Sequence, residues 1–255
     1  MKTKKYIIAN WKMNLNFSET IKLAKSFKEK FRGFNAGQIV VCPPLLFMTE
    51  VREILKKSGI AMGAQNVYWE NRGAYTGEVS ASMLKEAGCG YVILGHSERR
   101  KYLAENYEMI HKKIRAVLEV ENLTPIVCIG ESLEEKESNK RDFVLVDQLQ
   151  QALSGIDVFG DQLIIVAYEP IWAIGSGTAI APSEAEYAHK IIKLALNDMF
   201  GMPVVSKNFK VVYGGSINAK NAKSFASLDN MDGALVGAAS LKADEFYKVA
   251  KELTI

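Results

Sequence analysis

The chain has 255 residues, a hydrophobic fraction of 48% and a formal net charge of +3. This length and apolar content suffice for one sizeable core, and so small a net charge gives no reason to expect binding to nucleic acid or a membrane surface. Three cysteines without C-x-x-C spacing or a His/Cys cluster, and the lack of any apolar run of membrane-spanning length, predict a reduced cytoplasmic protein without disulfide or metal site.

Eight short apolar runs recur along the chain, each of a length that suits a buried β-strand. They cover residues 6–9, 39–42, 60–64, 91–94, 125–129, 163–168, 210–213 and 234–236. Helical patterns lie between them. One spans 18–31, with Ser18 as expected cap, and another spans 183–199, with Ser183 as cap and Glu186 at the capping-box position. Further helices are expected to begin near Pro44, Ser80, Asn106, Asp142, Asn221 and Asp244.

Strands that are apolar on both faces and alternate with helices indicate a parallel sheet with helical cover. Eight such units without a linker favour an α/β fold, a single-domain (β/α)8 barrel (TIM barrel) over 1–255. An open doubly wound sheet is the alternative. It usually has fewer strands, and the glycine-rich first turn of its dinucleotide-binding form is missing here.

The residues that follow the runs suggest a site, because barrel active sites lie at the carboxyl ends of the strands. In chain order they are Asn10 and Lys12, then His96, then Glu169, then Gly214-Gly215-Ser216, and finally Gly237-Ala238. A lysine, a histidine and a glutamate beside two glycine-rich loops indicate acid/base chemistry on a small anion, held by backbone N–H groups. Taken singly, each has a structural alternative: a surface cation, a structural histidine, a carboxylate at a strand end, or a tight turn.

The loop after Glu169 is unusual because its centre is apolar. It runs Pro170-Ile171-Trp172-Ala173-Ile174-Gly175-Ser176-Gly177. Such a segment needs a dry environment, so it is either a lid that closes over the site or a loop packed permanently on the body.

The chain resembles triosephosphate isomerases over essentially its whole length. The motifs that carry the resemblance are Asn10-Trp11-Lys12-Met13-Asn14, Ala64-Gln65-Asn66, Gly73-Ala74-Tyr75-Thr76-Gly77-Glu78, Gly95-His96-Ser97-Glu98-Arg99-Arg100, Cys128-Ile129-Gly130-Glu131, the segment 168–177, Tyr213-Gly214-Gly215-Ser216 and Leu235-Val236-Gly237. The resemblance implies interconversion of dihydroxyacetone phosphate and D-glyceraldehyde 3-phosphate, a step of glycolysis and gluconeogenesis, without cofactor or metal.

The resemblance also implies roles for single residues. Glu169 is the expected base, neutral His96 the electrophile, and Lys12 the support for negative charge. Asn10, Gly175, Ser216, Gly237 and Ala238 are expected to bind substrate, with support from Ser97, Glu98, Cys128 and Tyr213. Segment 170–180 is the expected lid. Segment 65–78, including Gln65 and Thr76, is the expected loop of a homodimer, in which Thr76 reaches the neighbouring site.

The sequence departs from the family pattern at three places. Ala238 replaces a usual glycine, Ser176 replaces a usual threonine, and Thr178-Ala179-Ile180 replaces the usual hinge. The phosphate site tolerates Ala238 if the backbone there does not need a positive φ.

Two other functions stay open at this stage. One is a different phosphate-binding barrel enzyme, such as a sugar-phosphate isomerase or an aldolase. The other is a non-enzymatic binding or surface-adhesion protein.

Overall fold

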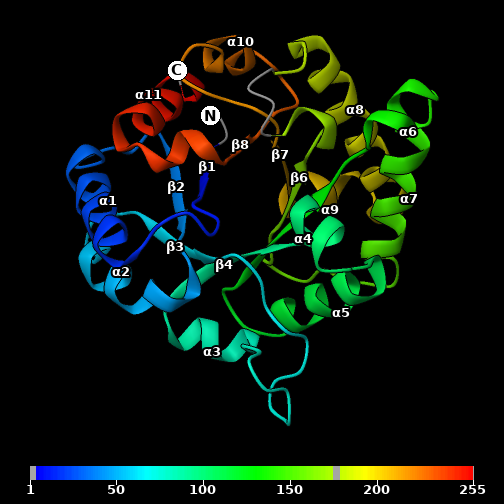
Figure 1. Ribbon diagram of the computed structural model, residues 1–255. Helices are drawn as coiled ribbons and strands as arrows, with labels where there is room; N and C mark the ends of the chain where they lie inside the picture. The colour runs from blue at the N-terminus through cyan, green and yellow to red at the C-terminus, as the bar shows by residue number, and fades with distance from the viewer. Residues whose placement is uncertain (1–3, 175–178, 255) are drawn as a thin grey trace.

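The computed structural model describes residues 4–174 and 179–254. Its strands form one closed parallel barrel in chain order, with β8 pairing β1 (Figure 1). The strands are β1 (Lys5–Asn10), β2 (Gly37–Cys42), β3 (Ala61–Ala64), β4 (Cys89–Leu94), β5 (Thr124–Ile129), β6 (Ile164–Tyr168), β7 (Phe209–Tyr213) and β8 (Gly233–Val236). The predicted (β/α)8 barrel is therefore confirmed, and closure through the β1–β8 pair rules out the doubly wound alternative.

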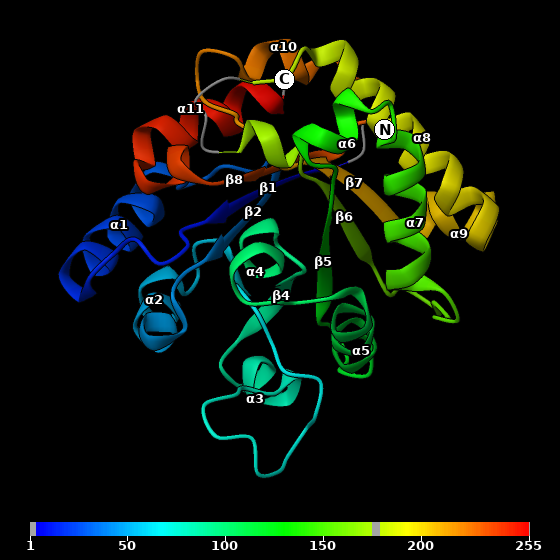
Figure 2. The same cartoon turned by 45° about the vertical axis from the view of Figure 1, so that its right-hand side comes forward.

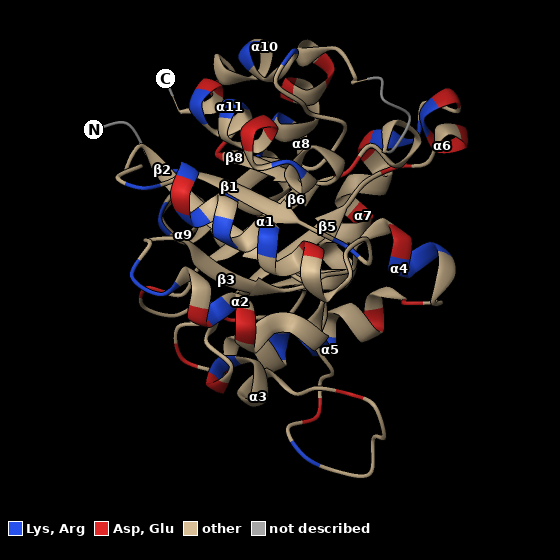
Figure 3. Ribbon diagram, turned by 60° about the vertical axis from the view of Figure 1, so that its left-hand side comes forward, with Lys and Arg blue, Asp and Glu red and all other residues tan. Residues whose placement is uncertain are grey.

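Helices surround the barrel on its outside (Figures 1 and 2). They are α1 (Phe17–Lys30), α2 (Met48–Leu55), α3 (Ala81–Glu86), α4 (Ser97–Tyr102), α5 (Tyr107–Leu118), α6 (Leu133–Glu137), α7 (Arg141–Leu153), α8 (Pro182–Phe200), α9 (Met202–Asn208), α10 (Ala222–Ala226) and α11 (Ala243–Leu253), with 3-10 turns η1 (Leu45–Phe47), η2 (Ile171–Ala173) and η3 (Ala238–Leu241). Charged residues of both signs spread over these helices and the loops (Figure 3). Within the described part of the chain, no helix has the length and apolar character needed to cross a membrane.

The apolar residues form two layers of core. The larger layer lies between the strands and the helices. The smaller one fills the barrel with Ile8, Val40, Cys42, Ile93, Ile126, Cys128, Ile165, Ala167, Val212 and Leu235. This two-sided burial explains why the strands read as continuous apolar runs rather than as alternating patterns.

Two predicted helix caps are wrong. The first helix begins at Phe17, and its cap is Asn16, which accepts a hydrogen bond from Glu19 N–H, rather than Ser18. The Glu19 side chain accepts from Asn16 N–H in return, so the two residues form a capping box, and the cap lies two residues before the expected one. In α8, Pro182 is the first helical residue and Ala181 the cap, so Ser183 lies inside the helix. Proline is favoured at this position because its φ is already helical.

Candidate active site

The mouth of the barrel, at the carboxyl ends of the strands, holds a cavity of about 500 Å³. The sequence-predicted residues that line it are Asn10, Lys12, His96, Glu169, Ser216, Gly237 and Ala238. They come from the ends of five strands that are far apart in sequence, and closure of the barrel brings them together. Gly175, predicted to bind substrate, lies outside the described residues.

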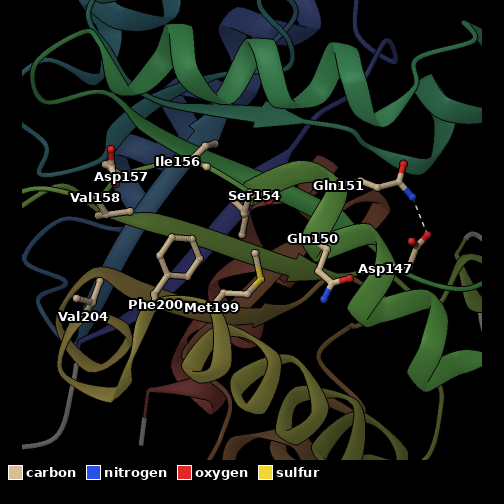
Figure 4. A pocket seen from close by; sticks show the side chains of 12 residues that line it. Asp147, Gln150, Gln151, Ser154, Ile156, Asp157, Val158, Met199, Phe200 and Val204 are labelled. Atoms are coloured by element: carbon tan, nitrogen blue, oxygen red, sulfur yellow. Dashed lines mark hydrogen bonds between the residues drawn. The ribbon is translucent and has the colours of Figure 1, made fainter.

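A larger cavity, of about 780 Å³, lies near the opposite end of the barrel, between the end of α7, the loop before β6 and the α8–α9 connection (Figure 4). Acidic, amide and apolar side chains form its lining among the described residues, with Asp147 and Asp157 as the titratable groups. None of these described lining residues offers a cation to an anionic substrate. In barrels this end serves stability rather than chemistry, so the smaller cavity is the candidate active site.

Lys12 has a strained backbone that neighbouring groups hold in place. Its φ is 53°, a region that non-glycine residues rarely adopt. Its N–H donates to Asn10 Oδ1 at 3.1 Å, and its carbonyl accepts from Gln65 Nε2 at 2.9 Å. The ammonium Nζ contacts Glu98 Oε1 at 2.6 Å. Gln65, predicted at the dimer contact, thus holds the Lys12 backbone within its own chain.

His96 and Glu169 meet inside the cavity. His96 Nε2 lies 3.2 Å from Glu169 Oε1, and Glu169 Oε2 accepts the Ser97 N–H at 3.0 Å. Both side chains are buried. His96 Nδ1 accepts the N–H of Glu98 at 3.2 Å. An accepting Nδ1 carries no proton, so the neutral ring is protonated on Nε2 and presents an N–H donor toward the cavity.

The backbone behind Glu169 leaves no room for side chains. A Cβ on Gly130 would lie 1.8 Å from the carbonyl oxygen of Glu169.

Cys128, predicted as a supporting residue, is fully buried on β5 beside Glu169. Burial, reinforced by the Glu169 carboxylate, raises the pKa of its thiol well above its usual range. Cys128 therefore stays a protonated packing residue rather than a nucleophile.

The two glycine-rich loops form the far wall of the cavity. Ala238 is the first residue of η3, and it is not among the described non-glycine residues with positive φ. The alanine that departs from the family pattern is therefore unstrained, and its N–H remains available. The Ser240 hydroxyl donates to the carbonyl of Gly237 at 2.6 Å, which fixes this turn.

A buried carboxylate that sequence reasoning missed holds the start of the apolar loop. Glu131 is fully buried, and its Oε1 accepts hydrogen bonds from Trp172 Nε1 at 2.9 Å and from the Tyr168 hydroxyl at 3.1 Å. Burial raises the pKa of Glu131, against the effect of these two donors. Lys136 Nζ lies 3.6 Å from the centre of the Trp172 ring. Glu131 stands at the end of a recognised motif, but no local pattern predicts its partners.

The other end of the loop meets Tyr213. Burial raises the pKa of its phenol, and a backbone group of Ile180 partly offsets this effect. The Tyr213 ring stacks on Phe225, with centroids 4.7 Å apart. Residues 175–178, the centre of the predicted lid, lie outside the described residues.

Comparison with known proteins shows the family to which the chain belongs. The family model for triosephosphate isomerase matches residues 5–253. The chain is 42% identical over 248 residues to the triosephosphate isomerase of Dictyoglomus turgidum, covering 97% of this chain and 99% of that protein. It is 43% identical over 249 residues to that of Dehalococcoides mccartyi, covering 98% and 96%. It is 43% identical over 246 residues to that of Alkaliphilus oremlandii, covering 96% and 98%. The chain therefore belongs to the triosephosphate isomerase family, and its reaction is the interconversion of dihydroxyacetone phosphate and D-glyceraldehyde 3-phosphate.

Proposed function

We propose that the cavity at the barrel mouth is where the triose phosphate reacts, with Glu169 as base, His96 as hydrogen-bond donor to the carbonyl and Lys12 as electrostatic support. The convergence of these three side chains on one cavity carries the proposal. Triosephosphate isomerases are the standard example of this division of labour. No metal or cofactor takes part in the proposed steps.

The reaction needs one proton moved between two neighbouring carbons. The Glu169 carboxylate takes a proton from the carbon next to the carbonyl, and the C–H electrons form the enediolate as the carbonyl oxygen becomes negative. The Nε2–H of His96 donates to that oxygen, and Lys12 stabilises the charge. The proton of the neighbouring hydroxyl passes to the former carbonyl oxygen by way of His96. Glu169 then returns its proton to the former carbonyl carbon, and the neighbouring carbon–oxygen bond becomes the new carbonyl. Because its carboxylate is bound to Ser97 N–H, Glu169 must release this hydrogen bond and turn toward the substrate when the substrate binds.

The substrate phosphate is held at the two glycine-rich loops. The N–H groups of Ser216, Gly237 and Ala238 are the proposed donors, together with Gly175 of the lid, while Asn10 binds another substrate oxygen. Segment 170–180 closes over the substrate and excludes water, which also protects the enediolate from losing phosphate. The Trp172–Glu131 hydrogen bond supports the start of this segment.

The chain acts as a homodimer in this proposal. Large apolar side chains are exposed on the loops after β1, β2 and β3, with Met13 95% and Leu46 81% accessible. The loop that contains 65–78 projects away from the barrel (Figures 1 and 2) and carries exposed Tyr75 and Thr76. Exposure of large apolar side chains on three loops at the same end of the barrel is consistent with an interface there. A second copy that covers Met13 brings its own Thr76 toward Lys12.

The test of the site is isomerisation of D-glyceraldehyde 3-phosphate, coupled to NADH oxidation through glycerol-3-phosphate dehydrogenase. General-base catalysis contributes about 10²–10⁴-fold, so Glu169→Gln should lose at least about 10²-fold in kcat while inorganic phosphate inhibits it as it does the wild type. A Gln variant with wild-type kcat would remove Glu169 from the mechanism.

The dimer is tested by sedimentation velocity. The wild type should sediment as a dimer, and Met13→Asp should sediment as a monomer with reduced kcat. A monomeric and fully active wild type would contradict the proposed assembly.

A further inference from the structure

We propose that Glu245 is a positioning residue that holds the phosphate-binding loop after β7. This inference rests on the phosphate site proposed above, because Ser216 in this loop is one of its donors. Glu245 lies in the first turn of α11, far in sequence from the loop, and it lines the active-site cavity.

The loop is ordered from within by a reciprocal pair of asparagines. Asn218 Oδ1 accepts the N–H of Asn221 at 3.3 Å and that of Lys220 at 2.9 Å, and Asn221 Oδ1 accepts the N–H of Asn218 at 2.8 Å. Asn221 Nδ2 also donates to the carbonyl of Ser216 at 3.2 Å. These bonds fix the shape of the turn and connect it to Ser216. They do not fix where the turn lies relative to the rest of the cavity.

Glu245 supplies that external connection. Its Oε1 accepts the N–H of Ala219 at 2.8 Å, in the middle of the turn. The helices α10 and α11 lie side by side at this edge of the barrel (Figure 1). The half-buried carboxylate of Glu245 thus joins the turn to a long helix that is packed on the barrel. A rigid anchor of this kind holds the Ser216 N–H in the direction of the phosphate before substrate arrives.

The negative charge of Glu245 has two opposing effects on phosphate binding. A carboxylate on the wall of a cavity that receives a phosphate dianion repels the ligand, although Lys242 on the same wall offsets part of this effect. A hydrogen bond from a backbone N–H to a charged acceptor is stronger than one to a neutral group. The repulsion is therefore balanced by the firmer loop, and an amide in place of the carboxylate keeps the anchor without the repulsion.

Three variants separate the anchor from other roles of the residue. Glu245→Ala removes the acceptor, and Glu245→Gln keeps an acceptor oxygen without charge. Asp244→Ala is the matched control: Asp244 is also in the first turn of α11, but it pairs with Lys30 at 2.5 Å on the surface. For each variant we would measure kcat, KM for D-glyceraldehyde 3-phosphate, the inhibition constant of inorganic phosphate and the melting temperature.

We expect Glu245→Ala to raise both KM and the phosphate inhibition constant about tenfold, the ratio that corresponds to loss of a hydrogen bond to a charged group. Its kcat should change less, because the reacting groups are untouched. Glu245→Gln should inhibit with phosphate at least as well as the wild type, and Asp244→Ala should match the wild type. A role in helix stability alone changes the melting temperature in both Ala variants and leaves phosphate inhibition unchanged.

The inference is overturned if Glu245→Ala keeps the wild-type phosphate inhibition constant, if Asp244→Ala raises it equally, or if Glu245→Gln raises it as much as Glu245→Ala. A ¹⁵N NMR titration of the wild type with inorganic phosphate distinguishes this failure from failure of the phosphate site itself. Shifted amide signals of Ser216 and Gly237 support the site. Unshifted signals there would contradict the site and, with it, the role of Glu245.

Discussion

A methyl group added at Gly214 tests how closely the loop after β7 positions the base. Gly214 has no positive φ, so the change Gly214→Ala acts through space alone. The new Cβ would lie 2.9 Å from Glu169 Cγ and 3.2 Å from the carbonyl oxygen of Tyr168. The first distance is about half an ångström short of ordinary contact. Glu169 is fully buried, so its side chain must tilt rather than move freely away.

A displacement of 1 Å at a reacting group can cost about 10²-fold in rate, so about half that distance predicts a loss of about tenfold in kcat. The coupled isomerase assay measures this, with the melting temperature as a check on folding. Gly90→Ala is the matched control, because a Cβ there meets no atom within 4 Å, and it should keep wild-type kcat. A folded Gly214→Ala with kcat within twofold of the wild type would refute the reasoning.

The remaining predictions concern charge. Lys12→Met should lower kcat/KM by about 10³-fold in the coupled assay, because a charge pair at ~4 Å and an effective dielectric of ~20 is worth about 4 kcal/mol; a loss below tenfold would contradict its role. Burial raises the pKa of Glu131, so the native state loses stability as pH rises above the ordinary carboxyl range. Glu131→Gln keeps an acceptor oxygen without the charge, and it should raise the urea midpoint of unfolding at pH 8 but not at pH 4. A midpoint lower than that of the wild type at pH 8 would refute this. Burial lowers the pKa of His189 from 6.5 to about 3, so as the pH falls the unfolded state takes up a proton before the native state does. Between about pH 6 and 4 the wild type should therefore lose about 1.4 kcal/mol of unfolding free energy per pH unit more than His189→Gln. Urea unfolding that gives the same pH dependence of the unfolding free energy for both proteins would contradict this.

Periodicity in the sequence predicted the barrel because strands buried on both faces and amphipathic helices leave different patterns. Helix caps were less predictable. Ser18 and Ser183 are suitable caps by residue type, but Asn16 with Glu19 and Pro182 start their helices earlier. Choices between neighbouring capping residues depend on small energy differences that the packing of the whole helix decides.

The sequence predicted a shared site for Asn10, Lys12, His96 and Glu169, because active sites of barrels lie at the carboxyl ends of the strands. The residues behind them did not follow, because their partners are distant in sequence. Glu131 accepts from Trp172, and Glu245 holds Ala219. A carboxylate in a charged segment or in the first turn of a helix reads as an ordinary surface group until the fold brings its partner to it.

The measurement that tests the central claim most directly is isomerisation in D₂O, with deuterium in the product located by NMR. Proton transfer through Glu169 exposes the carried proton to solvent, so the wild type should place deuterium on the carbon next to the carbonyl of the product. Glu169→Gln should form product at least about 10²-fold more slowly. Product without deuterium, formed at equal rates by the wild type and Glu169→Gln, would contradict proton transfer by Glu169.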